Sequence, residues 1–447
     1  MSVWADFGFT SSPYAIDPIP ATREGEHLLV GRDAEIRNLV SRLESSARHP
    51  TIEGPFGVGK TSLIRVACFR MQRSFNEGKA SINSLIPLKE PIELYPDITI
   101  ERIQHRLFCQ VAEAFRVHKD RLEATGRRIP KQKDIERWLN DPVFSTRSVG
   151  ASLPLGGVTV GKGSSPNSSS VYSEFGFPRA MKASLESCFP ECGYGGFVGV
   201  IDNMELMRTS QKVRDVLDYM RDNILAQEGL RWILCGAQGV IRSAAATPRL
   251  GDTLGHPIEV NPIADELTSD VIARRIDAYK TREDPVVPIG PDNFWYLYDI
   301  FNRNLRTALK FAEEFSLWLH DQKAGGSGKG GYQDLLEAWV ANTADRYRDD
   351  AGEWLEERDW VTFDALSMRG GTCRPCHDFG EFGFESSKAM RSPIRTLKDA
   401  NLLTYEADEI DKRRKIATMT AVGWLVAYAR AGYNLPPRRS SVPSDFG

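Results

Sequence analysis

The sequence predicts an α/β fold in which a parallel sheet, covered by helices on both faces, precedes an all-helical unit and a small C-terminal unit of helices and strands. Two short, wholly apolar segments, FVGVI at 197–201 and WILC at 232–235, alternate with amphipathic helices, as strands buried on both faces do. Residues 265–322 show apolar positions at helical spacing only. Beyond residue 332, helical patterns alternate with short strand patterns.

The predicted core spans residues 28–264 and follows an irregular N-terminal arm at residues 1–27. Between about 145 and 175 the composition becomes rich in Gly and Ser, which indicates an insertion with a hairpin that turns at Gly156-Gly157. The expected elements of the core are helices at 33–43, 100–115 and 211–226, and strands at 51–52, 197–201 and 232–235.

The all-helical unit at 265–322 is expected to form a lid, and a Gly-rich linker at 323–331 follows it. Residues 332–431 show the order of elements that is typical of a winged helix. In it, Ser392 is expected to cap a recognition helix with Pro393 at its first position, after a short helix near 385–391. Residues 432–447 are expected to be disordered.

Composition excludes several classes of protein. The 447 residues carry 57 Lys and Arg against 60 Asp and Glu, a net charge of −3, so nucleic-acid binding would need a local basic patch. No apolar run approaches the roughly 20 residues that cross a bilayer, and the N-terminus lacks a secretory signal pattern. Seven sparse cysteines fit a reducing compartment. We therefore expect a cytoplasmic protein with no membrane partner.

The strongest functional signal is a glycine-rich turn between a strand and a helix. Residues 54–61, GPFGVGKT, match the phosphate-loop (Walker A) pattern G-x-x-x-x-G-K-[ST] at every fixed position. The glycines let successive backbone N–H groups face one anion, Lys60 can reach the phosphates of ATP, and Thr61 can ligate Mg²⁺. The predicted nucleotide-binding residues are Gly54, Pro55, Phe56, Gly57, Val58, Gly59, Lys60, Thr61 and Ser62.

A buried strand that ends in an acid supplies the second signal. Asp202 follows the strand at 197–201 and is expected beside Mg²⁺, as in a Walker B motif. The next residue, Asn203, cannot accept a proton from water, whereas Glu205 can. The catalytic base is therefore Glu205 or is absent, and we expect slow ATP hydrolysis.

With these motifs the chain resembles the AAA+ P-loop ATPases, most closely the branch of origin-recognition-like initiators and transposon regulators, which is related to STAND proteins. Phe7-Gly8-Phe9 is similar to a motif of the N-terminal arm in that branch, and Val30, Gly31 and Arg32 are similar to the segment that lines the adenine pocket. The resemblance implies an AAA+ core, a helical lid and a C-terminal winged helix. It also implies a homo-oligomer formed with ATP.

The resemblance further implies roles for polar residues beyond the second buried strand. Gln238 takes the place of the first sensor, and Arg306 that of the second sensor, which faces the γ-phosphate from the lid. Arg249 or Arg242 would be the arginine finger for a neighbouring subunit. The chain departs from the family at Asn203 and at Arg303, which replaces a glycine, and both departures favour slow hydrolysis.

Basic residues gather in the predicted winged helix. Arg395 and Lys398 are expected on the outer side of the recognition helix, whereas Ile394 and Leu397 face the core. The wing between the two strands adds Lys412, Arg413 and Arg414. This distribution suits contacts with the phosphates of double-stranded DNA, and a winged helix that contacts only protein is the alternative.

Cys373-Arg-Pro-Cys376-His377 has the C-x-x-C-H spacing of haem attachment and of half a zinc site. Haem attachment would require export, and the only other close cysteine pair, Cys188 and Cys192, belongs to a different predicted domain. We interpret the segment as a loop between elements of the winged helix.

Three functions stay open on this basis. The first is an ATP-dependent AAA+ protein whose oligomer binds double-stranded DNA or recruits a partner machine. The second is a STAND-like switch in signalling or defence that touches no DNA. The third is a loader or adaptor whose winged helix binds only protein. Binding to duplex DNA separates the first from the other two.

Overall fold

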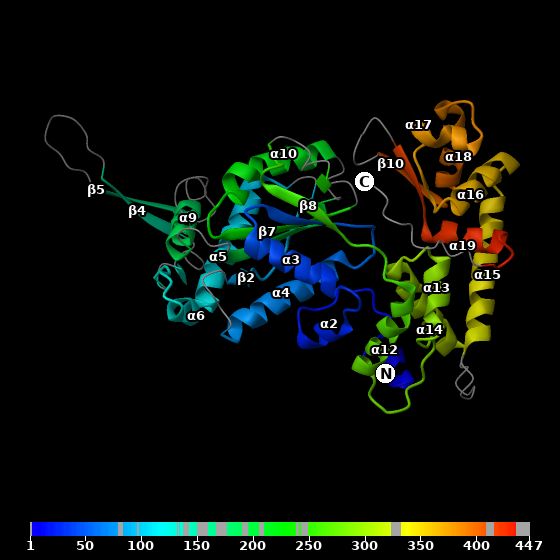
Figure 1. Ribbon diagram of the computed structural model, residues 1–447, viewed down its shortest axis with the longest axis horizontal. Coiled ribbons are helices and arrows are strands. Elements are labelled where there is room, and N and C mark those ends of the chain that lie inside the picture. Colours follow the sequence, from blue (N-terminus) through cyan, green and yellow to red (C-terminus); the bar gives the residue numbers. More distant parts are fainter. Residues whose placement is uncertain are drawn as a thin grey trace. The chain divides into compact units, whose positions relative to one another are not determined.

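The computed structural model describes residues 2–78, 84–95, 98–131, 133, 135–136, 143–149, 160–166, 177–189, 195–204, 210–237, 241–242, 249–322, 332–407 and 415–434 (Figure 1). Its contacts form two compact units. We name them the sheet unit (Ala34–Glu53 and Ile64–Glu259) and the helical unit (Met1–Asp33, Gly54–Leu63 and Val260–Gly447).

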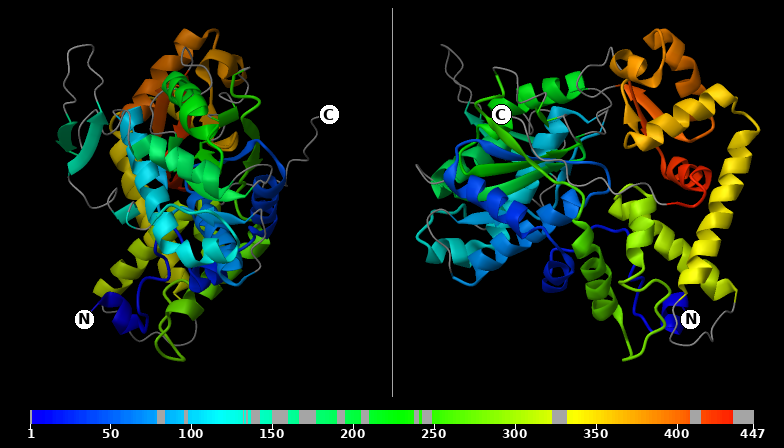
Figure 2. Two further views of the ribbon diagram at one scale, coloured as in Figure 1. Left: turned by 90° about the vertical axis from the view of Figure 1, so that its left-hand side faces the viewer. Right: turned by 45° about the vertical axis from the view of Figure 1, so that its right-hand side comes forward.

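The sheet unit is built on a parallel sheet in the order β2-β6-β7-β1-β8, with β3 also paired to β6. All seven residues of β6 and all seven of β7 are buried, because helices cover both faces of the sheet (Figure 2). The predicted α/β fold class is confirmed. The strands are β1 (His49–Glu53), β2 (Leu85–Pro87), β3 (Ile92–Glu93), β6 (Gly196–Asp202), β7 (Leu230–Gly236) and β8 (Leu254–Glu259).

Helices of this unit follow the predicted order. The helix expected at 211–226 ends as a π-helical turn at Arg221–Leu225. In the insertion, β4 (Val143–Val149) pairs antiparallel with β5 (Val160–Pro166), and the expected turn at Gly156-Gly157 lies outside the described residues. The helices are α3 (Asp33–Ser45), α4 (Lys60–Asn76), α5 (Ile100–Val117), α6 (Lys119–Ala124), α9 (Phe177–Cys188) and α10 (Ser210–Met220).

A close contact between the two central strands explains the glycine in the apolar run FVGVI. Gly199 in β6 lies directly beside Trp232 in β7, whose side chain is fully buried. A Cβ atom at Gly199 would lie 2.4 Å from the indole ring, so no larger residue fits. The neighbouring Phe197 packs edge-on against Phe115 of α5, with ring centroids 5.0 Å apart.

The N-terminal arm is more ordered than the sequence predicts. It contains two short helices, α1 (Val3–Phe7) and α2 (Arg23–Leu28), the second capped by Thr22, whose side chain accepts a hydrogen bond from the Gly25 amide. Between them the fully buried Tyr14 donates its hydroxyl to the Ile289 carbonyl at 2.7 Å. The prediction of an irregular arm was wrong because helices of five or six residues are too short to show a period.

The helical unit contains the elements predicted as the helical lid, followed by those predicted as the winged helix. The lid holds a 3₁₀ turn (Asp265–Leu267), α12 (Thr268–Tyr279), α13 (Phe294–Ile300) and α14 (Leu305–Asp321). The linker predicted at 323–331 lies outside the described residues. The remaining elements are α15 (Gln333–Gly352), α16 (Glu357–Met368), β9 (Thr372–Cys373), α17 (Pro375–Asp378), a 3₁₀ turn (Phe379–Phe382), α18 (Ser387–Asp399), β10 (Leu403–Ala407), β11 (Lys415–Met419) and α19 (Ala421–Arg430).

One hydrophobic core runs through the lid and the C-terminal helix. Leu425, Tyr428 and Ala429 of α19 are buried with residues of α13, α14 and α15, and Figure 2 shows α19 beside α15. The hydroxyl groups of Tyr296 in α13 and Tyr428 lie 2.7 Å apart in a buried hydrogen bond. The last helix of the winged helix therefore packs directly on the lid.

The recognition helix α18 begins earlier than predicted. It starts at Ser387, and the side chain of Ser386, not of Ser392, caps it by accepting the Ala389 amide. Pro393 lies inside the helix and is buried with Met390, Ile394 and Leu397. An internal proline costs about 3 kcal/mol, and burial of this apolar face offsets that cost. The prediction of a helix start at Ser392 was therefore wrong.

The C-x-x-C-H segment is not a loop. Cys373 ends β9, which pairs with β11, and Cys376 lies in α17. Burial raises the pKa of Cys373 to about 12, so its thiol is unreactive at neutral pH. Within the described part of the chain, no group of three or more His, Cys, Asp or Glu residues could hold a metal ion.

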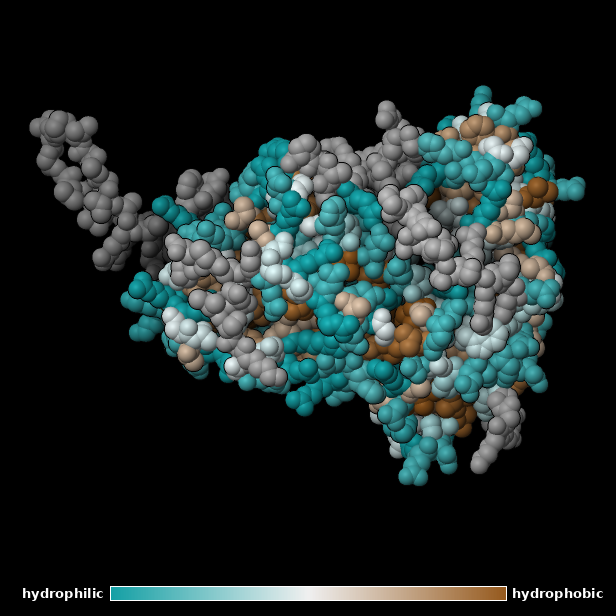
Figure 3. All heavy atoms as spheres, in the orientation of Figure 1, coloured by the Kyte–Doolittle hydropathy of each residue, from teal (hydrophilic) through white to brown (hydrophobic). Residues whose placement is uncertain are grey.

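The surface is mostly hydrophilic in the view of Figure 3, with scattered apolar residues. No helix among the described residues is both long enough and apolar enough to cross a membrane.

A buried histidine at the start of β1 predicts acid sensitivity. Burial, with the nearby charge of Arg231, lowers the pKa of His49 to about 4, and its Nε2 lies 2.8 Å from the Leu225 carbonyl oxygen. Between pH 6.5 and pH 4, His49 is protonated in the unfolded chain but stays neutral in the folded chain. The free energy of unfolding therefore falls as the pH falls.

We expect this group to cost roughly 2 to 3 kcal/mol of unfolding free energy between pH 7.5 and pH 4.5. His49→Gln keeps a donor for the Leu225 carbonyl but cannot titrate. The loss of unfolding free energy between the two pH values should therefore be about 2 to 3 kcal/mol smaller in this variant than in the wild type. Urea denaturation of both proteins at the two pH values measures the difference. Equal losses would show that His49 is not the titrating group.

Candidate nucleotide site

The phosphate loop connects β1 to α4, and Lys60 is the first residue of that helix. Gly57 and Gly59 have φ angles of +80° and +99°, which glycine adopts at little cost. No atom lies within 4 Å of the position that a Cβ on Gly59 would take, so it is the backbone conformation, and not crowding, that favours glycine there. This backbone fits the phosphate groups of a nucleotide.

Side chains hold the carbonyl groups of the loop. The Lys60 ammonium, on a side chain that is almost fully buried, donates to the carbonyls of Gly54 at 2.8 Å and Pro55 at 3.1 Å. Arg32 donates to the carbonyls of Val58 at 3.1 Å and Asn261 at 2.7 Å. The predicted adenine-pocket residue Arg32 thus braces the phosphate loop itself.

The other predicted binding residues lie around the loop. Val30 is buried in the core of the helical unit, and Gly31 packs tightly against Leu267, whose Cδ1 would lie 2.7 Å from a Cβ. The Ser62 hydroxyl accepts the Ile19 amide at 3.1 Å, which ties the N-terminal arm to the first turn of α4. Thr61 is the second residue of that helix.

The lid touches the loop through the start of α14. The side-chain oxygen of Asn304 caps this helix by accepting the Thr307 amide, and its nitrogen donates to the Phe56 carbonyl at 3.1 Å. The guanidinium of Arg306 lies 5.4 Å from the centre of the Phe56 ring. Asn304 Oδ1 would lie only 2.5 Å from a Cβ on Gly57, so this contact also requires glycine there.

Arg303 has a backbone conformation that glycine adopts at little cost and other residues rarely adopt. Its φ is +61°, which costs a non-glycine residue about 1 to 2 kcal/mol. Its guanidinium donates to Asp265 at 2.7 Å. The ion pair, which is partly shielded from solvent, helps to hold an arginine in this conformation.

The acid of the second motif lies at the end of β6. Asp202 is buried and accepts the amide of Asn203 at 2.8 Å. Both β1 and β6 are parallel strands that end at the same edge of the sheet, with β7 between them. Neighbouring strands are about 4.8 Å apart, so the backbone of Asp202 at the end of β6 lies about 10 Å from the end of β1, the strand that leads into the phosphate loop. Asn203 itself has a φ of +57°.

The two arginine-finger candidates have different surroundings. Arg242 donates its amide to Glu53 at 2.7 Å and pairs its guanidinium with Glu259. Arg249 is 61% exposed and lies 3.8 Å from Asp222. Both side chains are similarly exposed, and they differ in that Arg242 has the closer acidic partners. The predicted sensor Gln238 and the predicted base Glu205 lie outside the described residues.

A basic stripe covers the outer face of α18. Arg395 and Lys398 are exposed, as predicted, and the longer helix adds the exposed Lys388 and Arg391 at spacings of three and four residues. Within the described residues, none of the four forms an ion pair. The predicted wing residues Lys412, Arg413 and Arg414 lie outside the described residues.

Four features of the site were not predicted from the sequence. Asn304 could have been found from its place before an amphipathic helix, because asparagine is a favoured cap. The bracing by Arg32 and the pairing of Glu53 with Arg242 join residues far apart in the chain, and no local pattern signals them. Lys388 and Arg391 were missed because the helix was expected to start at Ser392.

Three of the solved structures that are similar to this chain share little sequence with it. They are the Aeropyrum pernix ORC1 protein in complex with DNA (12% identity, TM-score 0.41) and the Aeropyrum pernix ORC2 protein in ADPNP–ADP complexes (11%, 0.44), each covering 95% of this chain and 98% of that chain. Cdc6p from Pyrobaculum aerophilum is 11% identical, with a TM-score of 0.41, over 94% of this chain and 96% of that chain.

No protein-family model and no curated protein sequence matches the chain. The identities and TM-scores to the solved structures are too low for any property of those proteins to be transferred. What the chain does is inferred from its own residues.

The double role of Asn304 leads to a stability prediction. Asn304→Ala removes the cap of α14 and the hydrogen bond to the loop, and should cost about 1 to 2 kcal/mol of unfolding free energy. Asn304→Ser keeps a capping oxygen but is too short to reach the Phe56 carbonyl, so it should lose less than half of that. Chemical denaturation of both variants measures the two contributions, and equal losses would contradict the capping role.

Proposed function

We propose that the chain is an ATP-binding AAA+ protein with slow hydrolysis that couples nucleotide-dependent oligomerisation to DNA binding or to recruitment of a partner machine. The observation that carries the proposal is the glycine-rich loop between a buried parallel strand and Lys60 at the start of a helix, with the lid helix α14 hydrogen-bonded to the same loop.

The residues divide the work of holding ATP. Lys60, at the positive end of the α4 dipole, would exchange the carbonyls of Gly54 and Pro55 for phosphate oxygens. Thr61 and Asp202 offer the oxygen ligands that Mg²⁺ prefers, and the ion would neutralise charge on the phosphates. Arg306 would leave the Phe56 ring for the γ-phosphate, which links the lid to the nucleotide.

Slow hydrolysis follows from the residue after Asp202. Asn203 offers no basic atom to an attacking water, and a positioned general base is worth about 10²- to 10⁴-fold in rate. Glu205 stays the alternative base. Arg249 would reach the nucleotide of a neighbouring subunit, so ATP would favour the homo-oligomer.

The winged helix would carry the DNA contact. The stripe of Lys388, Arg391, Arg395 and Lys398 on α18 suits duplex phosphates, and Lys412, Arg413 and Arg414 would extend it along the wing. Because α19 is packed on the lid helices, a movement of the lid on nucleotide binding would be passed to the winged helix.

Replacing the loop lysine tests nucleotide binding. Lys60→Ala removes a charged donor to phosphate, so ATP affinity should fall by about tenfold to a hundredfold. Unfolding free energy should fall by about 2 to 3 kcal/mol, because two hydrogen bonds from a charged donor to loop carbonyls are removed, and the fold should stay intact. Isothermal titration with ATP and Mg²⁺ measures the affinity, with Lys310→Ala, an exposed lysine of α14, as control. Unchanged affinity would remove the assignment.

Salt dependence tests the DNA contact. Removing one cation that pairs with a DNA phosphate should reduce the log–log slope of affinity against salt by about one. The double variant Arg391→Ala/Arg395→Ala should therefore bind duplex DNA more weakly, with a slope smaller by about two. Arg37→Ala/Lys310→Ala, which removes two exposed cations on α3 and α14, outside the winged helix, should keep the wild-type slope. Absence of duplex binding at low salt, even with ATP, would contradict the proposal.

A specific observation favours the alternative, a STAND-like switch whose winged helix contacts protein. Trp354, Val361 and Met368 are 74%, 61% and 80% exposed and follow one another at intervals of seven residues along α16 and the turn before it. Val361 and Met368, seven residues apart within α16, share one side of that helix, and large exposed apolar side chains of this kind are typical of protein contacts. Failure to bind DNA would move the proposal to this function.

A further inference from the structure

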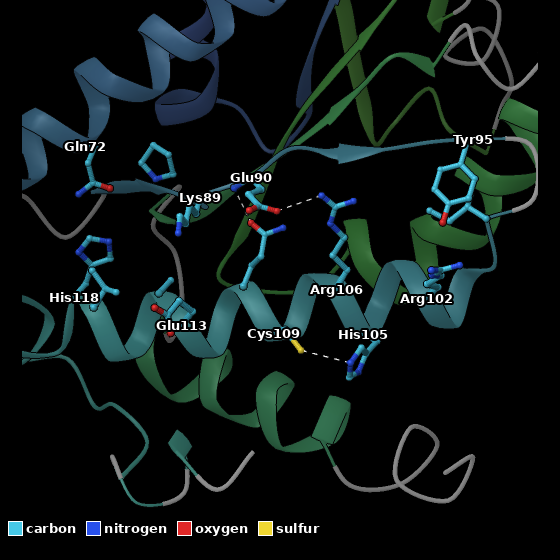
Figure 4. Close-up of a pocket in the computed structure, with 15 residues that line it drawn as sticks. Gln72, Lys89, Glu90, Tyr95, Arg102, His105, Arg106, Cys109, Glu113 and His118 are labelled. Atoms are coloured by element: carbon cyan, nitrogen blue, oxygen red, sulfur yellow. Dashed lines mark hydrogen bonds and ion pairs between the residues drawn. The ribbon is translucent and has the colours of Figure 1, made fainter. Parts of the chain in front are cut away.

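A groove in the sheet unit lies apart from the phosphate loop. Its volume is about 870 Å³, and its walls come from α5, from the segment between β2 and α5, and from the last turns of α4 (Figure 4). Nothing in the proposed ATP or DNA chemistry uses these residues.

The groove follows one whole face of α5. Arg102, Arg106, Cys109, Glu113 and Val117 are spaced by four, three, four and four residues, so they share one stripe of the helix. From Arg102 to His118 the lined face is about 24 Å long. That length matches about four turns of a second helix and exceeds the reach of a small ligand.

The neighbouring sheet edge is closed to strand pairing. Ser84 accepts the Gly196 amide and Leu88 donates to the Val198 carbonyl, so these residues direct their backbone groups toward β6. Alternation then turns the backbone groups of Leu85 and Pro87 to the open edge. Pro87 has no N–H there, which disfavours the addition of a strand. An occupant would therefore bind through side chains.

The charges of the groove are unbalanced. Its two acids are already paired, Glu90 with Arg106 at 3.3 Å and Glu113 with Arg116 at 2.5 Å. Lys89 and Arg102 have no ion-pair partner within the described residues. The Nε2 of Gln110 is buried and has no hydrogen-bond partner there, while its oxygen accepts the Glu90 amide. The remaining donors would suit carboxylates on an occupant.

Apolar side chains lie among these donors. Ile98 and Ala114 contribute to the lining, and Val117 is 59% exposed at the C-terminal end of α5. A partner helix could bury this surface and place acids beside Lys89 and Arg102. Such an arrangement is the helix-in-groove mode of recognition.

We propose that this groove binds an acidic amphipathic helix of a partner protein. Its apolar face would pack on Val117, Ala114 and Ile98, and carboxylates on its flanks would pair with Lys89 and Arg102. The inference does not depend on ATP or DNA binding.

The probe is a fluorescein-labelled helical peptide of about 16 residues, matched to the length of the groove, with Leu on one face and Glu on both flanks. Fluorescence anisotropy with the full-length protein should show saturable binding. Val117→Asp, at an exposed position, should weaken it by at least about tenfold. Lys89→Glu/Arg102→Glu should do the same. Arg37→Glu, which reverses an exposed cation on α3, is the matched control and should bind as wild type does.

A charge exchange gives the sharper result. The same peptide with Lys in place of Glu should bind Lys89→Glu/Arg102→Glu more tightly than it binds the wild type. Melting temperatures close to that of the wild type would show that each variant is folded. Tighter binding of the Lys peptide is a gain of affinity, which an unfolded variant could not produce. Equal binding of a scrambled acidic peptide, or no preference in the exchange, would overturn the proposal.

Discussion

The fixed carbonyl groups of the phosphate loop are the constraint on which the nucleotide site depends. Lys60 holds those of Gly54 and Pro55, Asn304 holds that of Phe56, and Arg32 holds that of Val58. With the carbonyls engaged by side chains, the loop's N–H groups are left for an anion, which is what a phosphate cradle needs. The donors come from the helix after the loop, from the segment before α3 and from the lid, so folding of the lid and preparation of the loop are one event.

The lid is in turn continuous with the winged helix through a shared core. Within the helical unit, α19 buries Leu425, Tyr428 and Ala429 against lid helices, and the hydroxyl groups of Tyr296 and Tyr428 meet inside that core. Separating them would expose these apolar side chains, each worth about 1.5 to 3 kcal/mol when large, and break a buried hydrogen bond. The contact at Asn304 and the contact at Tyr428 therefore lie at two ends of one packed group of helices.

Local patterns in the sequence predicted the features that depend on residues close together in the chain. Uninterrupted apolar runs marked β6 and β7, and fixed glycine and lysine spacing marked the phosphate loop. Prediction failed at Ser392, where a good cap and a proline suggested a helix start, because burial of Pro393 with Ile394 and Leu397 outweighs the local cost of the proline. It also failed for the bracing role of Arg32 and for the groove along α5, because both depend on segments that meet only after folding.

The backbone at Asn203 favours asparagine over glutamate at that position. With a φ of +57°, the residue lies in the left-handed region, where asparagine is enriched several-fold and longer side chains are strained. Its backbone N–H donates a hydrogen bond to the Asp202 carboxylate, and this bond orients the acid at the end of β6. A glutamate in the same backbone conformation would be strained by about 1 kcal/mol or more. A change of backbone that relieved this strain would disturb the orientation of Asp202. The geometry thus favours orienting the Asp202 carboxylate over placing a basic side chain beside it, and, if the chain binds ATP as we propose, this arrangement would favour slow hydrolysis.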